Sequence, residues 1–213
     1  MEEKTVRKIM SRYFEIKQIK AIPTQGAGPD FLEAGKAIEI KGSGARGARF
    51  NPALTQFAKY AFKYSNLEVA LPIDVLSADN LIKFTLLCRI VLEVLHKSIK
   101  TYLIAKDGQQ YFVKSYYDGS QVLNTLLNRI PKWSYFKHEF QDVMNKLEVI
   151  LPMVDRSIQS ALLEEIRTEP DMKILISEIE KKLVKLRVEA VDHKGKPLLV
   201  PFKIKKVSED TKA

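Results

Sequence analysis

The 213-residue sequence contains a single cysteine and only three histidines. The lone Cys88 excludes an internal disulfide and a zinc site built from cysteines. His96, His138 and His193 lie far apart, without the spacing of metal ligands, so we assign none of them to a metal. The sequence also lacks a Gly-rich phosphate-binding loop and a catalytic triad, so the enzyme classes built on these motifs are not indicated.

Long apolar runs are missing as well. The most apolar stretch, residues 81–95, is too short to span a bilayer and is interrupted by Lys83, Arg89 and Glu93. No apolar run follows a basic segment near the first residue, so no secretory signal is visible. With the single cysteine, these features predict an intracellular protein that does not enter a membrane.

Charge is the first positive signal. The net charge is +9, and residues 1–65 hold 12 Lys and Arg against 6 Asp and Glu, whereas the rest of the chain holds 23 against 20. A basic excess of this kind suggests a polyanionic substrate such as nucleic acid. The alternative is an ordinary solvated basic surface, and charge by itself does not decide between the two.

Hydrophobic periodicity predicts an α/β protein with a mixed sheet, in the α+β manner. The first half alternates helices with strands, at residues 2–17, 18–24, 31–34, 37–41, 52–64, 67–73 and 78–97. Asp107-Gly108 predicts a further hairpin. The second half is expected to be largely helical, at 120–128, 136–151 and from 155 onward, with a helical stripe at Ile176, Ile179, Leu183 and Leu186 and a last strand at 197–204. We therefore expect an α/β core over residues 1–118 and a mostly helical extension over 119–213 for dimerisation or substrate shaping.

The most informative stretch is Gly28-Pro29-Asp30-Phe31, followed by Ala37-Ile38-Glu39-Ile40-Lys41-Gly42. An acid after a proline, then an acid and a lysine two residues apart in an apolar strand, is typical of a metal-dependent phosphodiester-cleaving site. Because side chains alternate along a strand, Glu39 and Lys41 share one face, while Ile38 and Ile40 face a core.

Gly35 predicts the hairpin turn that returns Asp30 to the side of Glu39. Two carboxylates and the Lys41 ammonium then converge, as an Mg²⁺ ion (with Mn²⁺ as a substitute) and an attacking water require. The alternative is that Asp30 merely caps a turn and that Glu39 and Lys41 form an exposed pair on an edge strand.

The order of these elements resembles the PD-(D/E)xK nuclease superfamily, which has the restriction-endonuclease-like fold. The run Ile22-Pro23-Thr24-Gln25-Gly26 before Pro29-Asp30 is similar to archaeal Holliday junction resolvases. The chain length and the helical second half are similar to nucleases of archaeal spindle-shaped viruses, which implies the host cytoplasm as location if the protein is viral. The resemblance covers about residues 1–75.

This resemblance implies a role for each matching residue. Asp30 and Glu39 would bind divalent cations, and Lys41 would orient or activate the attacking water. An acid on the first helix would complete the metal site, either Glu3 or Glu2. The glutamine of the following helix corresponds to Gln56, and Thr24 is the nearest match to a small hydroxyl residue before the Pro-Asp.

Candidate DNA contacts lie beyond the motif. Gln56, Lys59, Tyr60 and Lys63 recur at helical spacing and share a face, which could meet a phosphate backbone. Arg46 and Arg49 lie in a glycine-rich segment, residues 42–51, that we expect to be an exposed loop able to order over DNA. A plain solvated helix face and an inert loop are the alternatives.

The leading hypothesis is an Mg²⁺-dependent DNA endonuclease, a hydrolase that acts as a homodimer on branched or structured DNA such as a Holliday junction. Two active sites on a two-fold axis could cut the two strands of a symmetric junction. The competing hypothesis is a DNA-binding module with a nuclease-like fold that does not cut.

Overall fold

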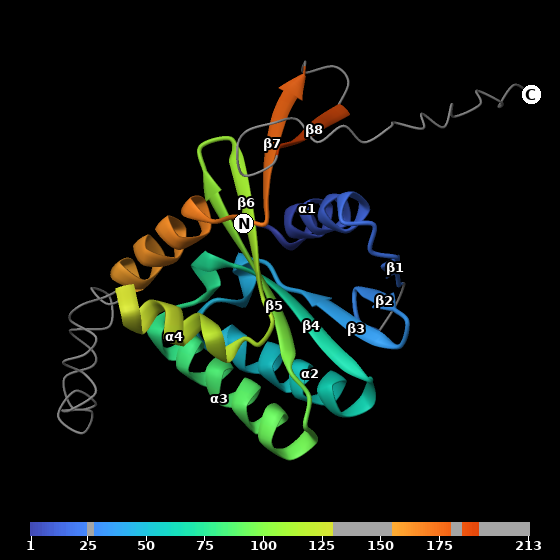
Figure 1. The fold of residues 1–213 in the computed structure, drawn as a ribbon, viewed down its shortest axis with the longest axis vertical. Helices are drawn as coiled ribbons and strands as arrows, with labels where there is room; N and C mark the ends of the chain where they lie inside the picture. The colour runs from blue at the N-terminus through green and yellow to red at the C-terminus, as the bar shows by residue number, and fades with distance from the viewer. Residues whose placement is uncertain (25–27, 130–154, 180–184, 192–213) are drawn as a thin grey trace, which may run out of the picture.

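A computed structural model describes residues 1–24, 28–129, 155–179 and 185–191. Its centre is a mixed sheet of eight strands in sequential order, so the predicted α/β class is confirmed (Figure 1). The strands are β1 (Ile22–Pro23), β2 (Phe31–Glu33), β3 (Lys36–Ile40), β4 (Asn66–Pro72), β5 (Ile99–Asp107), β6 (Gln110–Tyr116), β7 (Met172–Ile179) and β8 (Lys185–Val191). The helices are α1 (Glu3–Ile16), α2 (Phe50–Lys63), α3 (Ala78–Leu95), α4 (Ser120–Arg129) and a helix over residues 155–168.

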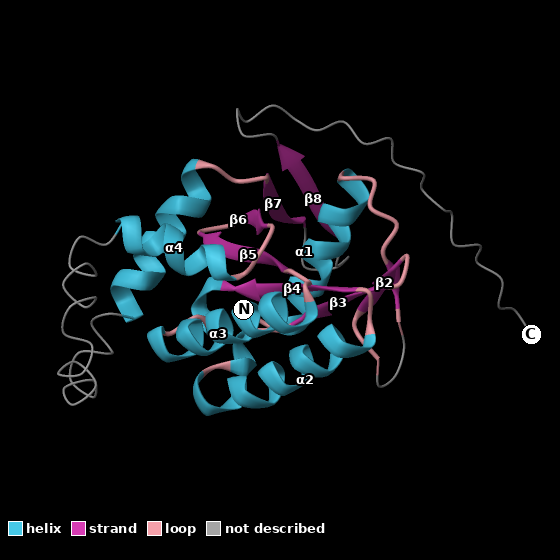
Figure 2. Ribbon diagram, turned by 60° about the horizontal axis from the view of Figure 1, so that its bottom comes forward, coloured by secondary structure: helices cyan, strands magenta, loops and turns pink. Residues whose placement is uncertain are grey.

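Strand direction separates the sheet into three parts. Strands β3, β4 and β5 are parallel, and α2 and α3 form the two crossovers that this direction requires. The pairs β1–β2, β2–β3, β5–β6, β6–β7 and β7–β8 are antiparallel. Helix α1 lies on one face of the sheet and α2 and α3 lie on the other (Figure 2).

Each face of the sheet has its own hydrophobic core. On one face, Val6 and Phe14 of α1 pack with Ile38 and Ile40 of β3. On the other, Phe57 of α2 and Phe84 of α3 join strand residues in a larger core, to which α4 and residues 155–168 also contribute. The alternation along β3 thus buries the two isoleucines on the α1 side, as predicted from the period of two.

The β2–β3 hairpin turns at Ala34 and Gly35, which have φ of +46° and +83°. Two consecutive positive φ values are typical of the two-residue turn whose twist matches antiparallel strands. This turn confirms the predicted role of Gly35, and it fixes the register in which Phe31 faces Ile38.

Two expectations for the second half differ from the structure. The predicted helical stripe is wrong, because Ile176 and Ile179 lie in β7 and Leu186 lies in β8. Apolar residues three apart also occur in strands, and the β-branched Ile174 and Ile176 favour the extended form. Residues on both sides of position 118 contribute to the one sheet and to its cores. The elements predicted at 136–151 and 197–204 lie outside the described residues.

None of the helices formed by the described residues combines the length and the apolar character needed to cross a membrane.

The hairpin turn makes a first prediction. Gly35→Ala should lower the free energy of unfolding by about 1–2 kcal/mol, because an L-residue at this φ is strained. Ala34→Gly is the matched control and should not destabilise, because it removes a Cβ from the same kind of conformation. Urea denaturation of both variants measures the difference, and equal midpoints for Gly35→Ala and the wild type would contradict the assigned turn.

Candidate active site

The candidate site lies where β3 ends. After Ile40, the backbone of Lys41 donates a hydrogen bond to the carbonyl of Ala70 on β4 (3.0 Å). The next residue, Gly42, packs against the start of α1: a Cβ there would lie only 2.4 Å from the backbone nitrogen of Glu3. This close approach of backbone to backbone brings the first turn of α1 to the end of β3.

Asp30 lies just beyond the end of the backbone hydrogen-bond ladder between β2 and β3. Continued register would place Pro29 opposite Ile40, but the carbonyl of Pro29 accepts a hydrogen bond from the Thr24 hydroxyl instead. The amide of Ile40 donates to Oδ2 of Asp30 (2.7 Å), so a carboxylate replaces a backbone carbonyl in the ladder. Thr24 thus fixes the carbonyl of the residue before Asp30, which is a structural role.

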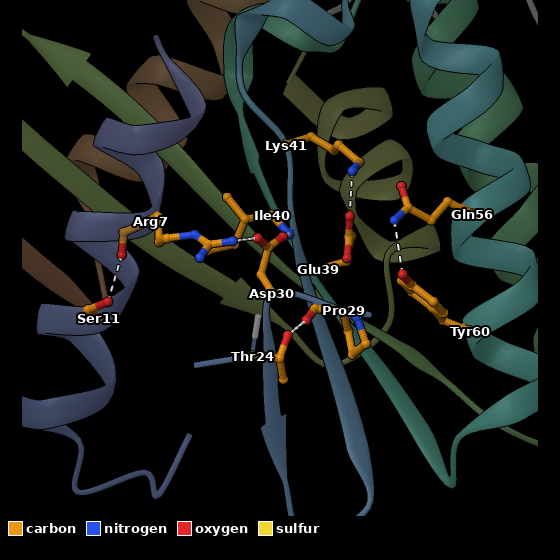
Figure 3. Close-up of polar contacts among 10 residues, drawn as sticks. All are labelled: Arg7, Ser11, Thr24, Pro29, Asp30, Glu39, Ile40, Lys41, Gln56 and Tyr60. Carbon is orange, nitrogen blue, oxygen red and sulfur yellow. Dashed lines mark hydrogen bonds and ion pairs between the residues drawn. The ribbon is translucent and has the colours of Figure 1, made fainter. Parts of the chain in front are cut away.

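Arg7 of α1 forms an ion pair with Oδ1 of Asp30, as seen at the left of Figure 3. Both oxygens of the buried Asp30 carboxylate therefore have a donor. Sequence reasoning missed Arg7. The available signal was its position one helical turn after Glu3, which puts both side chains on one face of α1.

Glu39 is the most buried of the motif residues, with 2% of its surface exposed. Its Oε1 accepts a hydrogen bond from Nζ of Lys41, whereas its Oε2 is buried without a hydrogen-bond partner. Burial raises the pKa of the Glu39 carboxyl above its ordinary value; Lys41 lowers it, Glu3 raises it and Arg7 lowers it, without cancelling the rise.

The structure thus brings part of the predicted set together. Lys41 pairs with Glu39, and the charges of Glu3 and Arg7 both act on Glu39. The Asp30 carboxylate is instead directed to Arg7 of α1 (Figure 3). The predicted exposed edge pair is excluded, because Glu39 is buried on an inner strand between β2 and β4.

Could the site hold a divalent cation? The donors are carboxylate oxygens, which Mg²⁺ prefers, and the orphaned Oε2 of Glu39 lacks the partner that a buried anionic oxygen needs. Within the described ranges, however, no group of three or more His, Cys, Asp or Glu is close enough to hold a metal. The predicted three-acid set is therefore not preassembled, and the fit rests on the unpartnered Oε2 of Glu39.

Gln56 lies on α2, and its amide points toward the Lys41–Glu39 pair in Figure 3. Its hydrogen bond goes to the hydroxyl of Tyr60, at 3.0 Å. Tyr60 is buried in the core, so it does not belong to the predicted outer face. Lys59 and Lys63 are exposed on α2, as predicted for residues that could meet a polyanion.

The glycine-rich segment is more ordered than predicted. It forms two short 3₁₀ turns, Ser43–Ala45 and Gly47–Arg49. Arg46 is not free to order over DNA, because it forms an ion pair with Asp74 at the end of β4. Arg49 is exposed.

Asp74, which sequence reasoning did not single out, gathers several donors. It accepts hydrogen bonds from the hydroxyl of Ser43 (2.7 Å) and from the amino group of Met1 (3.1 Å), besides the contact with Arg46. Burial raises its pKa, but these hydrogen bonds outweigh burial, so the pKa of Asp74 lies below its ordinary value.

Two cavities lie beside Asp74. One, of about 620 Å³, is lined by the start of α1, the ends of β4 and β5 and residues 155–168; the other, of about 460 Å³, contains Arg46 and Asp155. Asp30, Glu39 and Lys41 do not line either cavity. The motif residues and the two cavities therefore lie next to each other at the ends of β3 and β4, but the motif residues are not inside a cavity.

A comparison of the chain with protein-family models, with curated proteins and with solved structures found no match. The nature of the site therefore follows from these residues and their geometry.

The raised pKa of Glu39 predicts a stabilising substitution. The folded protein holds this proton more tightly than the unfolded chain, so the contribution of Glu39 to stability is present below its unfolded pKa and is lost as the pH rises through the folded pKa. Glu39→Gln should therefore raise the Tm at about pH 7, and the gain should shrink toward about pH 4, where the glutamate is protonated.

Thermal unfolding across this pH range measures the effect. Glu164→Gln, which removes an exposed carboxylate, is the matched control and should change the stability by less than about 0.5 kcal/mol. A Glu39→Gln variant less stable than the wild type at neutral pH would show that the Lys41 pair outweighs the cost of burial.

Proposed function

We propose that this protein is an Mg²⁺-dependent DNA endonuclease of the PD-(D/E)xK type that acts on branched or structured DNA. The observation that carries the proposal is the buried Glu39, which has Lys41 on one oxygen and no hydrogen bond on the other. A buried carboxylate oxygen without a partner calls for an explanation, and coordination of a cation would supply one.

The element order supports the same proposal. Helix α1, the β2–β3 hairpin with Asp30 and Glu39, helix α2 with Gln56 and strand β4 follow in the order that the sequence resemblance implies. The site also lies at the carboxyl ends of parallel strands β3 and β4, where ligands bind in open α/β sheets.

Each residue has a distinct part in the proposed hydrolysis. Glu39 would supply an oxygen to Mg²⁺ or Mn²⁺, and Asp30 would supply a second one after it leaves Arg7. Glu3 is a further acid whose charge acts on Glu39. The bound cation would supply Lewis-acid stabilisation, which is worth several kcal/mol in such reactions. Lys41 holds and orients the attacking water and offsets developing negative charge, and it can do so only after its ammonium turns from Glu39 toward the phosphate.

Contacts with the DNA backbone would come from exposed cations of the segment that follows the motif. Lys59 and Lys63 of α2, with Arg49 before it, lie on the sequence segment that follows the motif. They suit phosphate contacts, which position a duplex without reading its sequence. Arg46 would contribute only if it left Asp74.

A DNA-binding module that does not cut is the second candidate, and one observation favours it. Arg7 and Lys41 already neutralise Asp30 and Glu39, and no group of three acids is assembled in the described part of the chain. A neutralised pair of this kind can hold a fold together without any cation.

Cleavage separates the two candidates. Incubation of the wild type with plasmid, duplex, flap and four-way junction DNA in Mg²⁺ or Mn²⁺ should give cuts, most rapidly in branched substrates. Lys41→Ala should lower the rate at least about 100-fold, as expected for loss of a group that positions a proton or charge. Lys36→Ala, at the other end of β3, is the matched control. Failure of the wild type to cut any substrate would favour the binding module.

Cation binding can also be measured without activity. Mg²⁺ at 100 times its dissociation constant should stabilise the wild type by about 2.7 kcal/mol, if it binds only the folded state. The rise in Tm between EDTA and Mg²⁺ should be absent in Glu39→Ala and retained in Glu33→Ala, which removes a carboxylate from the same hairpin. Equal shifts in both variants would place the cation elsewhere.

A further inference from the structure

The larger of the two cavities, of about 620 Å³, is formed by the start of α1, the carboxyl ends of β4 and β5 and the helix over residues 155–168. Its volume falls within the range of roughly 300–1,000 Å³ that is usual for small-molecule sites. The carboxyl ends of parallel strands are also where open α/β sheets bind their ligands. In size and position, this cavity therefore resembles a ligand site.

The helix over residues 155–168 turns one face toward the cavity. Its apolar face, with Ile158, Leu162 and Ile166, is buried in the larger core. The residues that line the cavity lie three and four positions apart and share a different face of the helix: Arg156, Gln159, Ser160 and Leu163. The helix thus divides its side chains between the core and the cavity.

Two cations line the cavity without an acidic partner. Lys106, near the end of β5, lies 5.7 Å from the centre of the Tyr111 ring, and Arg156 is exposed. Neither side chain forms an ion pair with any residue of the described ranges. Both charges are therefore available to a bound anion.

Two acids line the same cavity but do not cancel these charges. Asp74 already forms an ion pair with Arg46, and the remaining acid, Glu2, is exposed. Cations thus outnumber the acids that are still available, so the cavity favours a negatively charged ligand.

The rest of the lining suits a ring with a polar edge. Gln159 carries both a donor and an acceptor, the combination with which glutamine pairs with the edge of a nucleobase. The hydroxyls of Thr5 and Ser160 can donate to phosphate oxygens. Apolar side chains supply much of the remaining surface: Pro72, Ile73, Ile104 and Leu163.

We propose that this cavity binds a nucleoside monophosphate. Lys106 and Arg156 hold the phosphate, for which a guanidinium group is suited by its fork of donors. The apolar side chains contact the base, and Gln159 pairs with the edge of the base. The motif residues do not line the cavity, so this site does not depend on the proposed nuclease activity.

Calorimetric titration with dAMP tests the site, in EDTA so that no divalent cation takes part. The wild type should bind dAMP with a dissociation constant of roughly 10–1,000 μM. Deoxyadenosine lacks the phosphate and 2-deoxyribose 5-phosphate lacks the base, so each should bind at least about tenfold more weakly. A wild type that does not bind dAMP up to about 10 mM would overturn the proposal, as would equal binding of either fragment.

Substitutions place the nucleotide in the cavity. Arg156→Ala should raise the dissociation constant for dAMP at least about tenfold, because it removes a charged donor to the phosphate. Ser160→Tyr should raise it similarly, because the larger side chain fills the cavity while the net charge is unchanged. Arg89→Ala, at an exposed arginine of α3 that does not line the cavity, is the matched control and should leave binding unchanged.

The three substituted positions are exposed, so circular dichroism should show all three variants to be folded. Unchanged binding in Arg156→Ala or in Ser160→Tyr would place the nucleotide outside the cavity and would overturn the proposal.

The same phosphate and base also occur at the 5′ end of a DNA strand, and a further titration distinguishes the two sources. A short 5′-phosphorylated oligodeoxyadenylate that binds more tightly than dAMP, and loses this advantage without its 5′ phosphate, would identify a strand end as the ligand. Weaker binding of the oligonucleotide than of dAMP would identify the free nucleotide. Either result supports a nucleotide site in this cavity.

Discussion

The burial of Glu39 in an inner strand is the constraint on which the rest of the site depends. Strand β3 lies between β2 and β4, so the Glu39 carboxylate, near the end of β3, loses most of its hydration. Lys41, two residues on, compensates one oxygen, and Arg7 of α1 adds a favourable charge at longer range. The remaining oxygen stays uncompensated. A fold retains an unfavourable group of this kind when the surrounding cores stabilise the structure by more than the group costs.

The two hydrophobic cores provide that stability. Phe57 and Phe84 are fully buried on one face of the sheet, and Ile38 and Ile40 on the other. Each such side chain stabilises the fold by about 1.5–3 kcal/mol when it leaves water, so a few of them offset the cost of burying one incompletely paired carboxylate. Ile38 and Ile40 flank Glu39 in sequence, so the residues that anchor β3 are also those that orient its charged side chain.

Local signals in the sequence predicted the hairpin turn and which side chains of β3 face the α1 core. Both depend on only a few consecutive residues, namely the turn residues and the alternation of side chains along a strand. Two sets of contacts were not predicted. Arg7 and Asp30 lie 23 positions apart in the sequence, and the residues that contact Asp74 lie 28 to 73 positions from it. Such pairs depend on how helices dock on the sheet, which a single sequence does not show. The prediction of a helical stripe at 176–186 failed for a different reason. Short apolar runs fit helix and strand alike, and the pairing of β7 with β8 favours the strand.

Gly42 has no polar side chain and takes no part in any hydrogen bond of the site beyond its backbone. Yet its missing Cβ is what lets the first turn of α1 rest directly on the end of β3. Any larger residue would act as a spacer between helix and strand and would draw Glu3 and Arg7 away from Glu39. The alignment of the charges on α1 and β3 thus depends on the absence of a Cβ at position 42. A substitution at this position should therefore disturb the site as much as a substitution of one of its charged residues.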